Sequence, residues 1–189
     1  LHKEYRRQRQ MCIRDSSLSG KTAIVTGATG LIGKEHCRAL AEAGANVVVA
    51  DMHIEACQSF LAQMPFSEKH MAIGFDVTKE EEVQKACEAI RNKYGRIDVL
   101  VNNAAINDMF ENRLMAGELS KFENYPVHMF RQSLEVNVTG MFLCSQVFGN
   151  EMLKQKSGSI INIASTYGLV GPDQSIYKLS LIHISEPTR

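Results

Sequence analysis

The chain has 189 residues, 44% of them hydrophobic, and its 21 basic and 21 acidic side chains balance. No apolar stretch reaches the roughly 18 residues that a membrane-spanning helix needs, so the composition argues against a membrane protein and for a soluble α/β domain. The five cysteines show no CxxC pairing, and no histidine has a histidine or cysteine neighbour at metal-ligand spacing. These patterns argue against a zinc site or a disulfide framework, and they predict reduced thiols in a cytoplasmic protein without a bound metal.

The first predicted feature in chain order is an end that does not belong to the fold. Residues 1–16 are basic and lack both apolar periodicity and the apolar core of a signal peptide. A basic arm that binds nucleic acid is one interpretation. We reject it because RRQRQMCIRDS resembles the in-frame translation of a common transposase-based DNA-sequencing adapter. Residues 179–189, LSLIHISEPTR, resemble the translation of the partner adapter.

Both ends are therefore expected to be non-native extensions of a native segment that covers about residues 17–178. On this interpretation the true C-terminus of the parent protein is missing. Without the two ends, 15 basic and 18 acidic residues remain, which is a net charge of −3. A slightly acidic domain gives no reason to expect nucleic acid as a partner.

Residues 21–51 predict a strand, a glycine turn, a helix and a second strand that ends in an acid. Thr22–Thr26 is a short apolar run bounded by turn residues, which is typical of a strand buried on both faces. Three glycines follow, and helical spacing then continues as far as Gly44. Residues 47–50 are a second buried strand, which runs into Asp51.

Each part of this unit has a physical role in binding a dinucleotide. Gly27 allows the tight turn, Gly30 lets the backbone approach a pyrophosphate, and Gly33 lets the helix pack close to the sheet. The free N–H groups at the start of the helix hold the phosphates, and Asp51 accepts a hydrogen bond from a ribose 2′-hydroxyl. Strand, turn, helix, strand and acid in this register predict dinucleotide binding.

Strands and helices go on alternating beyond Asp51. Periodicity predicts a helix over residues 54–64, a strand over 71–77, a helix over 79–94 capped by Gly95, and a strand over 97–101. Alternation of this length predicts right-handed crossovers and a parallel, doubly wound α/β sheet of the Rossmann type in a single domain. Such sheets bind ligands at the carboxyl ends of their strands, where Asp51, Asp76 and Asn103 are all expected to lie.

The next two segments are a polar stretch and a long helix. Residues 107–125 are polar with weak periodicity, which fits either a substrate lid or a surface excursion. A helix is expected from Pro126 to about Gln155, with an apolar stripe of Phe130, Leu134, Met141, Phe148 and Met152. Asn137 falls on the same stripe. It is either a satisfied core amide or a functional amide that holds water or backbone beside the site.

The last native element is predicted to be a fifth buried strand over residues 159–164, with Ser165 at its carboxyl end. Ser165 is either a strand-end capping hydroxyl or, because it shares the rim with Asp51 and Asn103, a group that binds the reacting oxygen.

Taken together, residues 17–178 resemble the short-chain dehydrogenase/reductase family. The resemblance rests on six pieces of sequence: residues 26–33 (TGATGLIG), Asp51, residues 76–77 (DV), residues 102–105 (NNAA), Asn137 and residues 161–165 (INIAS). Two features depart from the classical pattern. The glycines are spaced TGxxGxxG, which is nearer to sugar-nucleotide epimerases and dehydratases than the usual TGxxxGxG. Ala105 stands where the family usually has glycine.

The resemblance implies roles for individual residues. Ser165 would orient the substrate oxygen and Asn137 would support a proton relay. The residues implied to bind the cofactor are Gly27, Thr29, Gly30, Leu31, Ile32, Gly33, Asp51, Asp76, Val77, Asn103 and Ala104. The family's acid/base is a tyrosine followed four residues later by a lysine, whose charge lowers the pKa of the tyrosine. Tyr177 lies twelve residues after Ser165, near the usual gap, but position 181 is leucine and Lys178 is adjacent. We therefore expect the real pair to be encoded beyond the break.

The predicted function is an NAD-linked oxidoreductase that acts on a secondary alcohol or ketone. Sugar-derived compounds and polyols are the candidate substrates. Asp51 favours NAD over NADP, because a carboxylate repels a 2′-phosphate and residues 52–53 supply no arginine. The parent is expected to be a homo-oligomer, whereas this chain is expected to bind cofactor poorly, to turn over negligibly and to expose its fifth strand as an edge.

Two other functions remain open: a sugar-nucleotide epimerase or dehydratase, and a non-catalytic dinucleotide sensor. The coding DNA beyond codon 178 would separate them. A YxxxK pair within about 20 residues supports the oxidoreductase, and a further substrate domain of roughly 100 residues supports the epimerase. Neither feature would be expected for a sensor.

Overall fold

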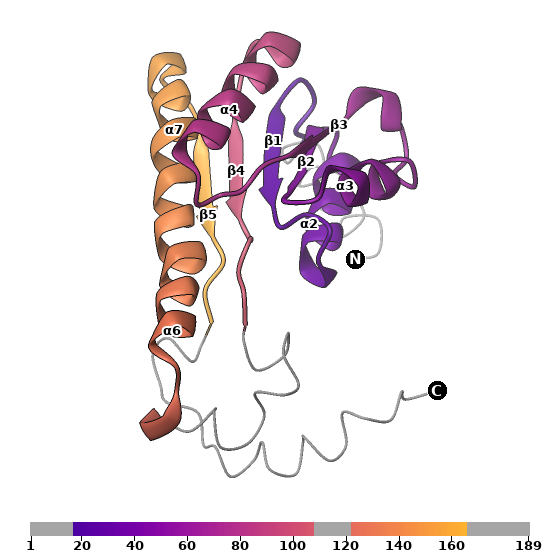
Figure 1. Cartoon of the computed structure of the whole chain (residues 1–189). Helices are drawn as coiled ribbons and strands as arrows, with labels where there is room; N and C mark the ends of the chain where they lie inside the picture. Colours follow the sequence, from indigo (N-terminus) through magenta and orange to yellow (C-terminus); the bar gives the residue numbers. More distant parts are fainter. Residues whose placement is uncertain (1–16, 108–121, 166–189) are drawn as a thin grey trace, which may run out of the picture.

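The computed structural model describes residues 17–107 and 122–165, which build one parallel sheet of five strands (Figure 1). The strands are β1 (Thr22–Thr26), β2 (Asn46–Asp51), β3 (Met71–Gly74), β4 (Val99–Asn102) and β5 (Ser159–Asn162). Their order in the sheet is β3-β2-β1-β4-β5, and every neighbouring pair is parallel. The predicted doubly wound parallel sheet is confirmed.

Helices cover both faces of the sheet (Figure 1). One face carries α2 (Leu31–Glu42) and α3 (Ile54–Leu61), and the other carries α4 (Glu80–Tyr94) and α7 (Met141–Gln155). Before α7 come α6 (Val127–Leu134) and a π-helical segment, η5 (Glu135–Gly140). Two short 3₁₀ turns, η1 (Ser67–Lys69) and η4 (Phe122–Asn124), are also present among the described residues. Within the described residues, no helix is long and apolar enough to cross a membrane.

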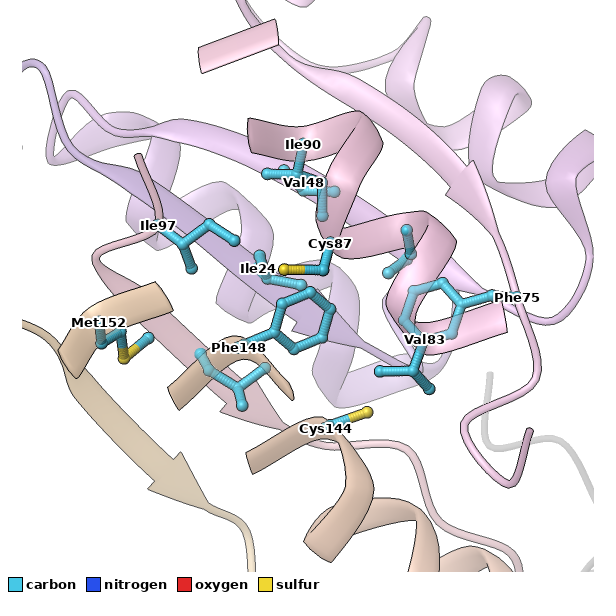
Figure 2. Packing of buried hydrophobic residues seen from close by; sticks show 13 residues of the cluster. Ile24, Val48, Phe75, Val83, Cys87, Ile90, Ile97, Cys144, Phe148 and Met152 are labelled. Atoms are coloured by element: carbon cyan, nitrogen blue, oxygen red, sulfur yellow. The ribbon is translucent and has the colours of Figure 1, made fainter. Parts of the chain in front are cut away.

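The central strand β1 is buried along its whole length because apolar side chains pack on both faces of the sheet. On the α4–α7 side, Ile24 and Val48 lie against Phe75 and Phe148, whose rings are 6.4 Å apart (Figure 2). On the α2–α3 side, the alternate residues of the same strands pack against Cys37, Cys57 and Phe60. The run of apolar residues in β1 and β2 thus reflects a sheet with two cores, as expected for parallel strands.

Strand bounds differ from the sequence-based ones by a few residues. The strand predicted over 71–77 ends at Gly74, because the chain turns where Oδ1 of Asp76 accepts the N–H of Thr78 at 2.9 Å. The strand predicted over 97–101 begins only at Val99. The helix predicted over 54–64 ends at Leu61 and continues as turns up to Pro65.

The fifth strand is not buried as predicted. Every residue of β5 is exposed, with Ile160 at 40% and Ile161 at 45%. Among the described residues, only β4 pairs with it, so β5 is the edge of the sheet. The predicted exposed edge is therefore present.

The long helix is interrupted where a regular one was predicted. In α7, Phe148 and Met152 are buried, but in α6 the predicted stripe residues Phe130 and Leu134 are 54% and 44% exposed. Their neighbours Met129 and Ser133 are half-buried instead. A π turn holds one more residue than an α turn, so η5 moves the inward-facing register of α6 back by one position.

Candidate functional site

A cleft of about 530 Å³ opens at the carboxyl edge of the sheet. Its walls come from the ends of β1 and β2, from the turn after β3, from the segment after β4, and from α6 and η5. Because all strands are parallel, side chains at the ends of distant strands meet here. Of the predicted site residues, Asp51, Asp76, Val77 and Ala104 line this cleft.

The glycine bend between β1 and α2 is tightly constrained at two positions. Gly27 has a φ of 61°, and a Cβ there would lie 2.8 Å from the Cα of Ala104. A Cβ on Gly33 would lie 2.2 Å from the carbonyl oxygen of Gly27. The predicted roles of Gly27 in the turn and of Gly33 in close packing therefore agree with the structure.

Gly30 stands in more open surroundings. A Cβ there would meet only the carbonyl oxygen of Gly27, at 3.3 Å. Gly30 is also the N-cap of α2 and supplies no side-chain cap, and the next two side chains, Leu31 and Ile32, are 89% and 57% exposed. The first N–H groups of α2 thus stand beside open space, which is the arrangement that an anion needs at a helix N-terminus.

Thr26 and Asn103 tie the end of β4 to the glycine bend. The hydroxyl oxygen of Thr26 accepts the N–H groups of Asn103 and Ala104, both at 3.1 Å. Nδ2 of Asn103 donates to the carbonyl oxygens of Thr26 and Gly27, both at 3.0 Å. The amino group of Asn103, a predicted cofactor contact, is therefore committed to holding the bend.

Asp51 stands at the end of β2 with its carboxylate held by three donors. Oδ2 accepts the hydroxyl of Thr29 at 2.6 Å and the N–H of Thr29 at 3.0 Å. Oδ1 accepts the N–H of Met52 at 2.8 Å. These three hydrogen bonds fix the orientation of the carboxylate.

Asn137 lies in the π turn and makes a two-point contact with the chain after β4. Its Oδ1 accepts the N–H of Ile106 at 2.8 Å, and its Nδ2 donates to the carbonyl oxygen of Ile106 at 3.0 Å. Ile106 lines the cleft. The amide thus holds backbone beside the site, which is one of the two interpretations of its place on the stripe. Its part in a proton relay stays a prediction.

A partly buried amide network, centred on the buried Asn102, supports the strand from which Ser165 emerges. Nδ2 of Asn102 donates to Asn162 Oδ1 at 2.8 Å and to Ser145 Oγ at 2.9 Å, which joins β4, β5 and α7. Ser165 follows β5 by three residues and is exposed at the carboxyl edge. It therefore shares this edge with the glycine bend and Asp51. Tyr177, Lys178 and most of the predicted flap, residues 108–121, lie outside the described residues.

Several residues of the cleft were not predicted from the sequence. Met52 and Thr78 follow strand-end acids, so the rule that ligands bind at carboxyl ends would have found them. Arg131, Gln132 and Glu135 reach the cleft from α6 and η5, and no local signal marks them.

No cysteine or histidine of the described residues lines this cleft. Burial raises the pKa of the Cys37 and Cys144 thiols to about 12 and that of Cys57 to about 11, so all three stay protonated at neutral pH. Among the described residues, no group of three or more histidine, cysteine, aspartate or glutamate side chains is placed so that it could hold a metal ion.

A parallel doubly wound sheet, a glycine bend before α2 and an acid at the end of β2 define a dinucleotide-binding domain of the Rossmann class. Comparison with known proteins identifies the family within this class. The sequence model of the short chain dehydrogenases matches residues 21–180, and the chain belongs to that family.

Relatives in this family have been described from bacteria. The chain is 41% identical over 154 residues to an uncharacterized oxidoreductase of Bacillus subtilis, covering 80% of this chain and 55% of that protein. It is 32% identical over 163 residues to an NAD-dependent glycerol dehydrogenase of Listeria innocua, covering 86% of this chain and 59% of the relative. Among solved structures, NAD⁺-bound xylitol dehydrogenase is 33% identical with a TM-score of 0.71, over 88% of this chain and 62% of that one. The chain thus spans little more than half the length of these relatives.

Proposed function

We propose that the protein to which this chain belongs is an NAD-dependent oxidoreductase that transfers hydride between the nicotinamide cofactor and a secondary alcohol or ketone. The observation that carries the proposal is the cleft at the carboxyl edge, flanked by the glycine bend and by Asp51. The bound nicotinamide would supply the hydride acceptor or donor. The family and the named dehydrogenases among the relatives support this reaction class.

The residues present fit a dinucleotide. Open space at Gly30 and the uncapped start of α2 suit a pyrophosphate, whose charge the helix dipole stabilises. Thr26 and Asn103 hold the bend in that shape. Val77 and Ala104 provide apolar walls in the same cleft as the acids Asp51 and Asp76.

Asp51 is the basis for proposing NAD rather than NADP. Two unit charges about 4 Å apart near a protein surface interact by about 4 kcal/mol, and a 2′-phosphate carries more than one charge. Arg131 of α6 lines the same cleft and is the one basic side chain among its described lining residues. Asp51 outweighs it because the end of β2, beside the glycine bend, is where this fold holds the ribose. The NAD-dependent glycerol dehydrogenase and the NAD⁺-bound xylitol dehydrogenase among the relatives support the same choice.

A polyol or sugar-derived alcohol is the substrate class we propose. Three relatives carry names of polyol dehydrogenases, for glycerol, D-threitol and xylitol. Ser165 would donate to or accept from the reacting oxygen, and Asn137, through Ile106, would hold the segment beside it. The glycine spacing still favours a second candidate, a sugar-nucleotide epimerase or dehydratase, but the family model and the named relatives favour the dehydrogenase.

The test is a comparison of dissociation constants for NADH and NADPH by isothermal titration calorimetry of the full chain. We expect weak binding with NADH the tighter ligand, and we expect Asp51→Ala to reduce that preference by about tenfold or more. Arg131→Ala is the matched control in the same cleft and is expected to leave NADH the preferred ligand. Tighter binding of NADPH to the unchanged chain would contradict the assignment.

A further inference from the structure

Two carboxylates on the rim of the cleft are held in the same way, each by one threonine. Oδ2 of Asp51 accepts the hydroxyl and the N–H of Thr29, at 2.6 and 3.0 Å. Oδ1 of Asp76 accepts the hydroxyl and the N–H of Thr78, at 2.8 and 2.9 Å. The second pair is a local turn two residues long, whereas the first joins residues 22 positions apart.

The Thr29–Asp51 pair therefore links two parts of the binding site. Thr29 lies in the glycine bend, next to the N-cap of α2, and Asp51 ends the neighbouring strand β2. Both residues are half-buried, so water competes only in part for their hydrogen bonds. A hydroxyl-to-carboxylate bond of 2.6 Å is in the short, charge-assisted range.

A count of acceptor sites shows what the pair leaves free. An ionised carboxylate accepts about four hydrogen bonds, two at each oxygen. The two donors of Thr29 fill Oδ2, and the N–H of Met52 takes one site on Oδ1 at 2.8 Å. Among the described residues no other donor reaches Asp51, so one site remains, and Asp51 lines the cleft. That site accepts one hydroxyl, and it repels an anion.

We propose that Thr29 is a positioning residue whose hydroxyl fixes the orientation of the Asp51 carboxylate. In that orientation, Oδ1 presents a single acceptor site to one ribose hydroxyl. Thr29 is thereby a determinant of selectivity for NAD over NADP. The proposal rests on the proposed function. Without the hydroxyl, Oδ2 keeps one donor and the carboxylate can rotate about χ2. Rotation weakens the bond to a ribose hydroxyl and also relieves part of the repulsion of a 2′-phosphate, so NADH is expected to lose affinity while the affinity for NADPH changes little.

A purely structural role for Thr29 makes a different prediction. If the hydroxyl only holds the glycine bend to β2, its loss disturbs the pyrophosphate site, which NADH and NADPH share. The two dissociation constants would then rise by the same factor. The ratio of the two constants, rather than either one alone, separates the two roles.

The experiment is a titration of the full chain and its variants with NADH and NADPH up to millimolar concentration. For Thr29→Val we expect NADH to bind about fivefold more weakly and NADPH to change by less than about twofold. Thr29→Ser keeps the hydroxyl and should keep the unchanged ratio. Thr29→Ala removes the hydroxyl without adding a methyl group and should repeat the effect of valine if the valine variant folds poorly.

Thr78→Val is the matched control, because it removes the same kind of bond from Asp76. It is expected to change the affinities for both cofactors by the same factor. In an Asp51→Asn background, Thr29→Val should cause no further change of the ratio, since the two residues act as one unit. Equal weakening of both cofactors by Thr29→Val, or failure of serine to preserve the ratio, would overturn the proposal. A chain that binds neither cofactor would instead refute the proposed function, and the positioning role with it.

Discussion

Gly30 and Gly33 are three residues apart in one bend but stand in opposite surroundings. A methyl group on Gly33 would meet backbone atoms of Gly27 and Ala28 within 3.0 Å, and backbone cannot move aside cheaply. A methyl group on Gly30 would have one neighbour, at 3.3 Å. The close packing at Gly33 and the proposed pyrophosphate site at Gly30 can therefore be tested separately.

We predict that Gly33→Ala lowers the free energy of unfolding by about 1–3 kcal/mol, because the helix must shift to admit the methyl group. Gly30→Ala should stay within about 1 kcal/mol of the unchanged chain and yet lose most of its affinity for NADH. Urea unfolding followed by circular dichroism and calorimetric titration measure the two effects. Gly149→Ala is the control inside a helix, where the new methyl group meets only Ile160 at 3.5 Å. Equal stability of the Gly33 and Gly30 variants would contradict this division of roles.

At the scale of residues, the sequence predicts where a residue lies in the sheet better than it predicts which group that residue hydrogen-bonds. Asp51, Asp76 and Asn103 were expected at strand ends: Asp51 is the last residue of β2, and Asp76 and Asn103 follow the ends of β3 and β4 by two residues and one. That expectation needs only the period of the apolar runs and the rule for parallel sheets. The partners of Asn103 and Asn137 are backbone atoms of segments remote in sequence, at Gly27 and Ile106, so no local pattern encodes them.

At the scale of elements, His70 joins the beginnings of β2 and β3. It is 4% exposed, its Nδ1 accepts the N–H of Val47 at 3.1 Å, and its Nε2 lies 3.2 Å from the carbonyl oxygen of Pro65. This pattern requires a neutral ring with the hydrogen on Nε2, because a protonated Nδ1 cannot accept. Burial is the main cause that lowers the pKa of His70 below its ordinary value of 6.5.

A lowered pKa of His70 makes stability depend on pH in a definite direction. Above about pH 6.5 the ring is neutral in both the folded and the unfolded chain, and it contributes no pH dependence. As the pH falls below that value, the unfolded chain takes up a proton that the folded chain resists, so the free energy of unfolding falls. The loss continues down to the pKa of the folded state.

We predict that His70→Asn, whose Oδ1 can still accept the N–H of Val47, flattens this dependence although it lowers stability at neutral pH. Urea unfolding between about pH 7.5 and pH 5 compares the two slopes. His53→Asn is the control, because His53 is exposed. An unchanged slope in the His70 variant would show that other groups carry the pH dependence.

The types of the predicted helices and strands are confirmed among the described residues, because apolar runs and helical periods distinguish them, whereas the 3₁₀ turns η1 and η4 were not predicted. The interruption of the last helix was not predicted either, since a π turn leaves no clear mark in the sequence. One added residue in η5 moves Phe130 and Leu134 outward and places the Asn137 amide against Ile106. The expected stripe was therefore right for α7 and wrong by one position for α6.

At the scale of the whole molecule, the two edge strands of the sheet differ in how far they are exposed. At one edge, α3 packs against β3, whose first three residues are partly buried. At the other edge, Ile160 and Ile161 of β5 and Ile163, one residue beyond the strand, are 37–45% exposed. An exposed apolar edge strand offers unpaired backbone groups to another chain, which is a common route to association.

We predict that the chain self-associates in a concentration-dependent manner and that Ile161→Lys reduces the association. A charge on the edge strand has to be desolvated when a second strand pairs with it, so pairing becomes unfavourable. Ala62→Lys adds the same charge at an exposed site after α3, far from β5 in the sheet order, and it should leave association unchanged. Sedimentation velocity over a range of concentrations distinguishes the variants. If both lysine variants reduce association equally, net charge rather than the β5 edge controls it, and the open edge is not the surface through which these chains meet.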